Sequence, residues 1–328
     1  MDADILSLSH WNVNAKTVES YRALQGRLFF VGDAAHRVPP WGALGLNSGI
    51  QDADNLIWKL ALALKHPHKS YDRLLDTYDA ERRPIGERVA RTSLHNLQSH
   101  AGVMDAALGI APTNSIEANT KAMAQYFDVT DKTGGARRRQ AIAQALEIMD
   151  IEFDAHGAEV GWFYPSADLN NEGTATRHDG QLTKDGELDL CVYHPSTIPG
   201  HQLPHAWLER DSRRVSTRDL VHLAKLTLFA QSAQPWADLA HDLVHVEIID
   251  PKIGWKDVDG AWRAQCGVGA SGAIFVRPDG IVAYRVPDSA SAAKANTSLN
   301  DVFAELVAIL LKEAVPLSGE RSVARYKL

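Results

Sequence analysis

The chain has 328 residues with a formal net charge of −7, and 45% of its residues are hydrophobic. This length is enough for two domains with substantial cores, and the negative charge argues against nucleic acid or an anionic membrane as the main partner. The sequence contains neither an apolar run of 18 residues nor an opening signal peptide, so we expect a cytoplasmic protein.

The first predicted elements are a strand at residues 5–9 and a buried strand at residues 28–31. The second strand ends in Gly32-Asp33, and a loop rich in proline and glycine leads to a helix expected to open near Asn47. Ligands of open α/β sheets bind beyond the carboxyl ends of the strands, where a helix N-terminus favours an anion or a polarised carbonyl. The segment therefore predicts a ligand site, and its alternative interpretation is a tight turn without a ligand.

Residues 26–61 resemble the second flavin-binding motif of the class A FAD-dependent aromatic hydroxylases, in the branch of the phenol and chlorophenol monooxygenases. The similarity runs without a gap through Val-Gly-Asp-Ala-Ala-His and Gly-Leu-Asn-Ser-Gly. It implies that Asp33 binds the ribityl chain of FAD, and that the loop and helix start line the isoalloxazine ring. The cofactor-binding residues implied are Gly32, Asp33, Pro40, Gly42, Gly45, Leu46 and Asn47. Trp41 stands where many relatives carry a smaller residue, and its indole would narrow the space beside the flavin.

The same resemblance implies an enzyme that uses FAD, with NADPH as hydride donor, to transfer oxygen from O2 to a phenolic substrate through a flavin C4a-hydroperoxide. No catalytic base is assigned, and His36 is expected to be a structural hydrogen-bonding residue. A Gly-x-Gly-x-x-Gly unit for the FAD pyrophosphate does not precede Asp33, so we expect the carboxyl-terminal part of a larger flavoprotein. Residues 267–272 fit that spacing, but a predicted hairpin at 273–286 follows them instead of a helix.

Two helices are predicted after the loop. The first places an apolar face toward the core and ends at Lys65, before Pro67; that face comprises Ile50, Ala53, Leu56, Ile57, Leu60, Ala61 and Leu64. The second begins after Tyr71, and Pro84 is expected to kink or restart it. Its arginines, Arg82, Arg83, Arg88 and Arg91, could meet a cofactor phosphate, but a solvated helix face is the preferred interpretation.

The predicted fold class is α/β, with a partial FAD-binding, Rossmann-like domain at residues 1–110. A helical connector at 111–164, with a helix at 136–148, leads to a thioredoxin-like domain at 165–328. The pattern predicts a strand at 226–230, a helix at 235–242, a strand at 244–249, the hairpin and a helix at 299–312. Residues 193–200, 203–208, 216–220 and 276–280 resemble the C-terminal domain of the same hydroxylase branch.

Three functions stay open at this stage. The first is part of a phenol hydroxylase, and the second is a non-catalytic truncated paralogue that serves as a dimerisation or binding module or as one half of a split flavoprotein. A thiol-redox function is disfavoured because residues 231–236, where thioredoxin-like enzymes carry their cysteine pair, contain no cysteine. Cys191 and Cys266 are expected to be buried free thiols, and no metal site is expected. We expect a homodimer formed through the C-terminal domain.

Overall fold

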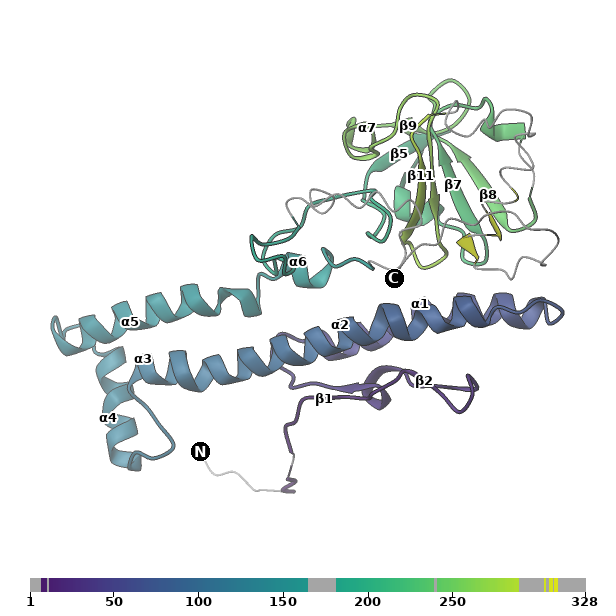
Figure 1. Cartoon of the computed structure of the whole chain (residues 1–328). Coiled ribbons are helices and arrows are strands. Elements are labelled where there is room, and N and C mark those ends of the chain that lie inside the picture. Colours follow the sequence, from purple (N-terminus) through teal and green to yellow (C-terminus); the bar gives the residue numbers. More distant parts are fainter. Residues whose placement is uncertain are drawn as a thin grey trace. The chain divides into compact units, whose positions relative to one another are not determined.

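The computed structural model describes residues 7–10, 12–164, 181–238 and 241–288, together with residues 304, 307, 308, 310 and 311 (Figure 1). The described residues form two compact units. One lies within residues 1–55, 78–163 and 174–194, and the other within residues 56–77, 164–173 and 195–328. The helices α1 (Leu44–Lys65) and α2 (Asp72–Ser99) each contribute residues to both units. The domain limits predicted at residues 110 and 164 stay a prediction.

The amino-terminal strands of the first unit are short antiparallel pairs. Strand β1 (Lys16–Thr17) pairs with β4 (His36–Arg37), and β2 (Arg22–Ala23) pairs with β3 (Leu28–Phe29). The expectation of a buried strand at 28–31 is therefore wrong, since β3 has two residues and Leu28 is 37% exposed. A tight turn with positive φ angles at Leu24, Gln25 and Gly26 folds this segment into a hairpin. The strand predicted at 5–9 is absent from its described residues 7–9, and the rest of it lies outside the described residues.

Helices α1 and α2 begin and end close to where the sequence predicts. Helix α1 opens at Leu44 instead of near Asn47 and ends at Lys65 as predicted, while α2 begins at Asp72, directly after Tyr71. The predicted restart at Pro84 is wrong, because α2 continues through it. Buried Arg82 and Ile85 hold the helix on both sides of the proline, which removes only one backbone donor.

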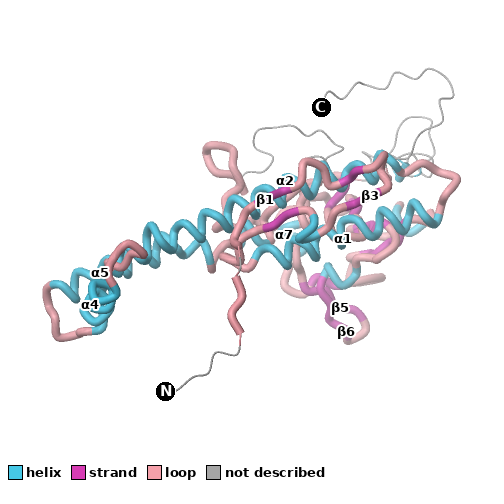
Figure 2. The backbone as a smooth tube through the Cα atoms, turned by 90° about the horizontal axis from the view of Figure 1, so that it is seen from below, coloured by secondary structure: helices cyan, strands magenta, loops and turns pink. Residues whose placement is uncertain are grey.

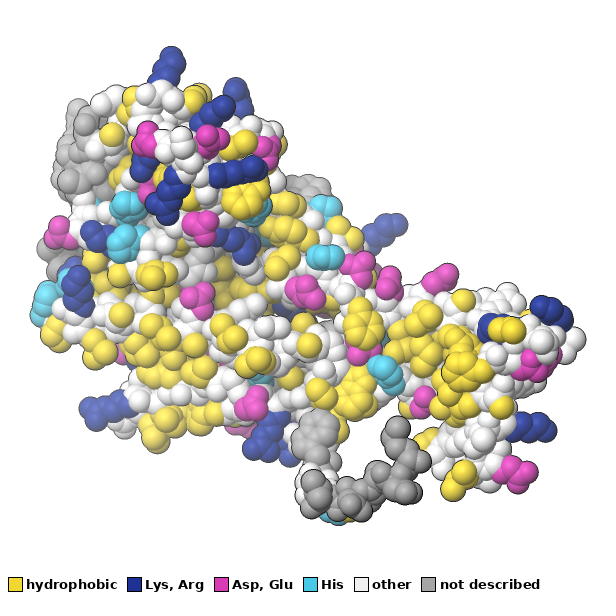
Figure 3. All heavy atoms as spheres, turned by 180° about the vertical axis from the view of Figure 1, so that it is seen from behind, with side chains coloured by type: hydrophobic (Ala, Val, Ile, Leu, Met, Phe, Trp, Pro, Cys, Tyr) yellow, Lys and Arg dark blue, Asp and Glu magenta, His cyan; other side chains and the backbone are white. Residues whose placement is uncertain are grey.

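Helix α1 buries the face opposite to the one predicted. The apolar face predicted for the core includes three exposed side chains, Ile50 at 59%, Ile57 at 63% and Leu64 at 79%, although Leu56 is buried as expected. The buried polar side chains of the helix are Ser48, Asp52, Asn55 and Lys59. Hydrophobic side chains gather along the long helices on the face seen in Figure 3. The polar face points inward because α2 supplies a partner for each of its charged or amide groups.

Shorter helices follow α2 in the first unit. Helix α2 runs through a π-helical turn (His100–Asp105) into α3 (Ala106–Leu108), which stops at the left-handed Gly109. Helix α4 (Ile116–Phe127) packs on α5 (Gly134–Met149) (Figure 2). Helix α5 confirms the prediction at 136–148, whereas α4 was not predicted. A 3-10 turn (Asp150–Glu152) and α6 (His156–Glu159) complete the series.

The second unit contains a four-stranded sheet in the order β11 (Val282–Val286), β10 (Ala273–Val276), β7 (Leu226–Ala230), β8 (Val244–Ile248). Strands β7 and β8 are parallel, and β10 is antiparallel to both β7 and β11. A parallel pair joined to an antiparallel hairpin agrees with the predicted thioredoxin-like pattern. The hairpin follows residues 267–272 directly, which confirms that this glycine-rich spacing leads into a strand and not into a helix.

Alternate side chains of this sheet enter two hydrophobic cores. Leu228 and Phe275 join the core that includes Trp58 and Leu62 of α1, whereas Phe229 joins the other core. That second core is closed by Trp262 of α7 (Ala261–Gln265) and by a small sheet of β6 (Arg213–Ser216), β5 (Trp207–Arg210) and β9 (Lys256–Asp257). A 3-10 turn (Thr217–Leu220) follows β6.

The two remaining predicted helices are described only in part. The described portion of the helix predicted at 235–242 is a 3-10 turn, Trp236–Asp238. Of the helix predicted at 299–312, residues 304, 307, 308 and 310 are helical and most others lie outside the described residues.

We predict that Phe229→Ala destabilises the protein by about 3–5 kcal/mol, because Phe229 is fully buried and the cavity left behind cannot close completely. Urea unfolding measures this loss. Leu223→Ala is the control, since Leu223 is 84% exposed and its truncation should change stability by no more than about 0.5 kcal/mol. Equal losses for the two variants would contradict the assigned core.

A second prediction concerns Asp131 at the start of α5. Hydrogen bonds from the backbone of Thr133 and Gly135 and from the Thr133 hydroxyl hold the pKa of this carboxyl well below its ordinary value. A depressed pKa in the folded state gives stability that is complete above the unfolded value, about 3.9, and disappears as the pH falls toward the folded value. Wild type should therefore be more stable than Asp131→Asn at pH 7, and the difference should shrink below about pH 4. Thermal unfolding across pH checks this, and a pH-independent difference would contradict it.

Candidate functional site

The Gly32-Asp33 turn is held in place from two sides. Residues Gly32–Ala34 form a 3-10 turn, in which Gly32 has a φ of 57°. On one side, the Tyr78 hydroxyl of α2 donates to the Phe30 carbonyl oxygen at 2.6 Å. On the other side, a Cβ added to Gly49 of α1 would lie 3.1 Å from the Gly32 Cα. The close approach of the turn to α1 therefore favours glycine at position 49, because a Cβ there would push the turn away by a few tenths of an ångström.

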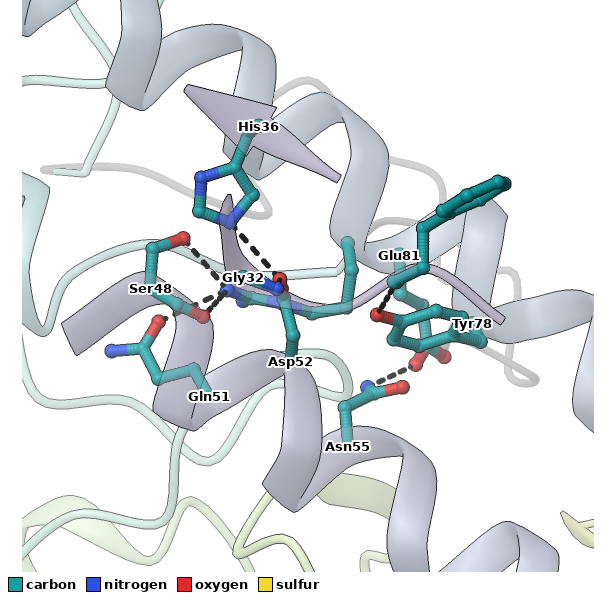
Figure 4. A network of polar contacts seen from close by, with 10 residues as sticks. Gly32, His36, Ser48, Gln51, Asp52, Asn55, Tyr78 and Glu81 are labelled. Carbon is teal, nitrogen blue, oxygen red and sulfur yellow. Dashed lines mark hydrogen bonds and ion pairs between the residues drawn. The ribbon is translucent and has the colours of Figure 1, made fainter. Parts of the chain in front are cut away.

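Asp52 of α1 is the centre of a buried polar network (Figure 4). Its Oδ2 accepts hydrogen bonds from the Gly32 backbone N–H at 3.1 Å and from His36 Nε2 at 3.0 Å. Its Oδ1 accepts from Arg82 Nε at 2.7 Å, and the side chains of Asp52 and Arg82 are both fully buried. The carboxylate thus joins the turn, strand β4 and helix α2.

Arg82 extends this network toward the start of α1. Its Nη2 donates to the Ser48 carbonyl oxygen at 3.1 Å, to Ser48 Oγ at 3.2 Å and to Gln51 Oε1 at 3.3 Å. The guanidinium also lies over the ring of Trp162, 5.3 Å from its centre. The expectation of a solvated face is therefore wrong for Arg82. Arg83 fits the expected solvated face better, because its side chain is one-third exposed and pairs with Asp79 and Glu87 on its own helix.

Next to the network, Asn55 donates to Glu81 Oε2 at 2.7 Å, and both residues are buried. Tyr21 lies fully buried beside it, with its backbone N–H bonded to Asp79. Burial, together with the negative charge of Asp52, raises the pKa of the Tyr21 phenol well above its ordinary value. His36 is a structural hydrogen-bonding residue, as the sequence predicts, because it is 1% exposed and bonded to Asp52.

A cavity of about 410 Å³ lies at the amino-terminal end of α1. Its apolar walls come from α1, α2 and the segment that follows α6, and they include Ile85, Val89 and Trp162. Its polar groups come mainly from Asn47, Ser48 and Gln51. A cavity lined by both apolar side chains and convergent polar groups, at the start of a long helix, is suited to a planar organic ring with a polar edge.

The structure brings some of the predicted cofactor residues to this cavity and leaves others outside it. Gly42, with a φ of 88°, and Asn47 line the cavity. Gly45 and Leu46 lie in the first turn of α1 without lining it, and Leu46 is 77% exposed. The other predicted residues, Gly32, Asp33 and Pro40, lie in the preceding turn and loop. Trp41 makes an edge contact with His100, with ring centres 6.1 Å apart.

Sequence reasoning missed Asp52 and Trp162, and it assigned Arg82 to a solvated helix face. A signal for the first was present, because the polar residues at positions 48, 52, 55 and 59 recur at helical spacing. No comparable pattern marks the other two residues.

Other kinds of site find no support in the part of the chain that the structure describes. Cys266 is buried as predicted, but Cys191 is exposed because it lies in a surface loop, which corrects the expectation for that thiol. No group of three metal-binding side chains occurs among the described residues. None of the helices described is both long and apolar enough to cross a membrane.

Comparisons with known proteins identify both ends of the chain. Residues 1–93 match the FAD binding domain family, and residues 196–305 match the family described as aromatic-ring hydroxylase, C-terminal. The chain is 34% identical to a phenol 2-monooxygenase of Pseudomonas sp. (strain EST1001) over 92% of its own length and 49% of that protein's. It is 33% identical to a 2,4-dichlorophenol 6-monooxygenase of Delftia acidovorans, over 86% of this chain and 47% of the relative.

Solved structures give the same assignment. The flavin-dependent monooxygenase PieE, in complex with FAD and substrate, matches with a TM-score of 0.77 and 33% identity over 92% of this chain and 50% of that one. The chain spans about half the length of the curated relatives that it matches. Its matched domains, relatives and fold show that the chain belongs to the FAD-dependent aromatic-ring hydroxylases.

Proposed function

We propose that the chain supplies part of the flavin and substrate site of an FAD-dependent monooxygenase that hydroxylates a phenolic ring. The observation that carries this proposal is the Gly32-Asp33 turn, fixed against α1 by Asp52, together with the cavity at the start of the same helix. Relatives named as phenol and dichlorophenol monooxygenases support a phenolic substrate.

The residues around the turn suit the parts of FAD that we assign to them. Asp33 is exposed, so its carboxylate is available to accept hydrogen bonds from ribityl hydroxyls. Pro40, Gly42, Gly45, Leu46 and Asn47 would line the isoalloxazine ring, and the positive φ of Gly42 gives the loop a conformation that L side chains rarely adopt. The start of α1 offers backbone N–H groups and the positive end of the helix dipole to a polar ring edge.

Bound FAD would supply the redox chemistry, with NADPH as the hydride donor and O2 as the source of the transferred oxygen. The side chains of this unit would orient the ring and exclude water from one side of it, through the apolar walls that Ile85 and Trp162 give the cavity. The proposal includes a homodimer and a cytoplasmic location, and the free thiols Cys191 and Cys266 agree with a reducing compartment.

We expect Asp33→Ala to weaken FAD retention by about tenfold, and Asp33→Asn to weaken it less. The amide oxygen can still accept a hydrogen bond, whereas alanine leaves a buried hydroxyl unpaired. For this experiment the chain is mixed with the part of a phenol 2-monooxygenase that the chain does not match. The FAD that stays bound is then measured by flavin absorbance after gel filtration. The chain alone is expected to retain FAD weakly or not at all.

The matched control for this experiment is Asp185→Ala, which removes an exposed carboxylate from another loop of the same unit. If Asp33→Ala and Asp185→Ala retain equal amounts of FAD, Asp33 does not bind the ribityl chain.

A second candidate function is a binding module, and the outward face of α1 favours it. Apolar residues recur there at alternating spacings of four and three, as in a helix-packing seam; they are Leu46, Ile50, Ala53, Ile57, Leu60 and Leu64. Four of them are more than half exposed. A seam of this kind needs an apolar partner. We assign as its partner a complementary flavoprotein segment, because the matched relatives are about twice as long as this chain.

We predict that the double variant Ile57→Gln, Leu64→Gln binds the unmatched part of a phenol 2-monooxygenase at least tenfold more weakly than wild type, since it loses two large apolar contacts. Isothermal titration calorimetry measures this affinity, with Leu223→Gln as an exposed control outside the helix. Undiminished binding by the double variant would exclude the seam, and self-association of the chain through this face would assign the seam to a second copy instead.

A further inference from the structure

Arg82 lies between two parts of the proposed site without lining either of them. Through Asp52 it reaches the Gly32 backbone N–H, and through its own Nη2 it reaches Ser48 and Gln51 at the cavity. Its guanidinium also covers the ring of Trp162, which is 5% exposed and bonded through Nε1 to the Glu159 carbonyl oxygen. One fully buried side chain therefore contacts the helix start and the cavity wall directly, and it reaches the turn through Asp52.

The geometry of this contact set depends on a planar, forked donor. Nε and Nη2 of Arg82 point in fixed directions, so the Asp52 carboxylate and the Ser48 carbonyl oxygen are held at a set separation. A lysine has the same charge but a single nitrogen at the end of a flexible chain, and it cannot satisfy both sides with the same geometry. Arg82 fixes the Asp52 carboxylate, and the same carboxylate accepts the hydrogen bond of the Gly32 N–H. A movement of the Arg82 side chain is therefore transmitted to the Gly32-Asp33 turn.

We propose that Arg82 is a positioning residue that, through Asp52, sets the Gly32-Asp33 turn relative to the ring cavity. The functional meaning of this inference rests on the proposed flavin site, because the turn and the cavity are the two places assigned there to the ribityl chain and the ring. The structural part of the inference, which is the control of the turn by Arg82, can be tested in the chain by itself.

The test compares Arg82→Lys with Arg83→Lys in the full 328-residue chain. Arg83 is the matched control, since it is the adjacent arginine of α2 and its hydrogen-bond partners Asp79 and Glu87 lie on its own helix. Hydrogen–deuterium exchange resolved to single amides is the readout. We expect the Gly32 amide to exchange about tenfold faster in Arg82→Lys, because a charge-assisted hydrogen bond is weakened, and to be unchanged in Arg83→Lys.

The exchange pattern separates positioning from general stability. Amides of β7 in the second unit and of α5 in the first should exchange at wild-type rates in Arg82→Lys. Unchanged exchange at Gly32 would overturn the proposal, and so would an equal acceleration of all these amides. If Arg82→Lys does not fold, Asp52→Asn is measured instead. An asparagine side chain has a single, neutral oxygen, so it cannot accept from Gly32 and from Arg82 through two separate charged oxygens, and the same local acceleration is expected.

The consequence for cofactor binding is measured separately. With the unmatched part of a phenol 2-monooxygenase added, Arg82→Lys should retain FAD about tenfold less tightly than Arg83→Lys. If the wild-type chain mixed with that part does not bind FAD, the proposed function is refuted. The positioning role of Arg82 is then still tested by hydrogen–deuterium exchange at Gly32. Normal FAD retention by Arg82→Lys, together with accelerated Gly32 exchange, would overturn the role of the turn in holding the cofactor.

Discussion

The buried ion pair of Asp52 and Arg82 is the interaction on which the first unit depends most. Removing two charges from water is costly, and the loss of either partner from such a pair typically costs about 3–5 kcal/mol, because it leaves the other charge buried and unpaired. Here the pair is surrounded by further hydrogen-bond partners: Gly32 and His36 donate to Asp52, and Ser48 and Gln51 accept from Arg82. The turn, the strand β4 and the two long helices therefore meet at one fully bonded carboxylate.

This interaction also explains why α1 has its polar side inside. Each of three buried polar residues of α1 has a partner on α2: Asp52 bonds Arg82, Asn55 bonds Glu81, and Lys59 bonds Thr77. The positions rise along α1 as they fall along α2, as antiparallel helices require. With these groups paired inside, the apolar side of α1 is left at the surface. The proposed enzyme and the proposed binding module share this helix, since its start contributes to the cavity and its outward face forms the seam.

Local signals in the sequence predicted the elements that depend on local causes. Lys65-His66-Pro67 marks the end of α1, and the segment around Pro278-Asp279-Gly280 marks the β10–β11 hairpin. The order of strand, helix, strand, hairpin and helix predicts the thioredoxin-like sheet. The buried face of α1 could not be predicted in the same way. Both its faces have helical periodicity, and the choice between them depends on Arg82, about thirty positions away. Because its partner Asp52 is so far away in the sequence, nothing near Arg82 distinguishes it from an ordinary surface arginine.

The length of α1 between Asp52 and Lys59 is under a constraint that most helices do not have. Each residue of an α-helix turns by about 100°, so a single insertion or deletion between these positions would rotate Lys59 away from the side that carries Asp52. One of two buried charges would then lose its partner, and the apolar residues beyond that point would change sides. Over evolutionary time this segment should tolerate substitutions but not changes of length, in contrast to the exposed turn at residues 183–187, where insertions and deletions leave no buried charge behind.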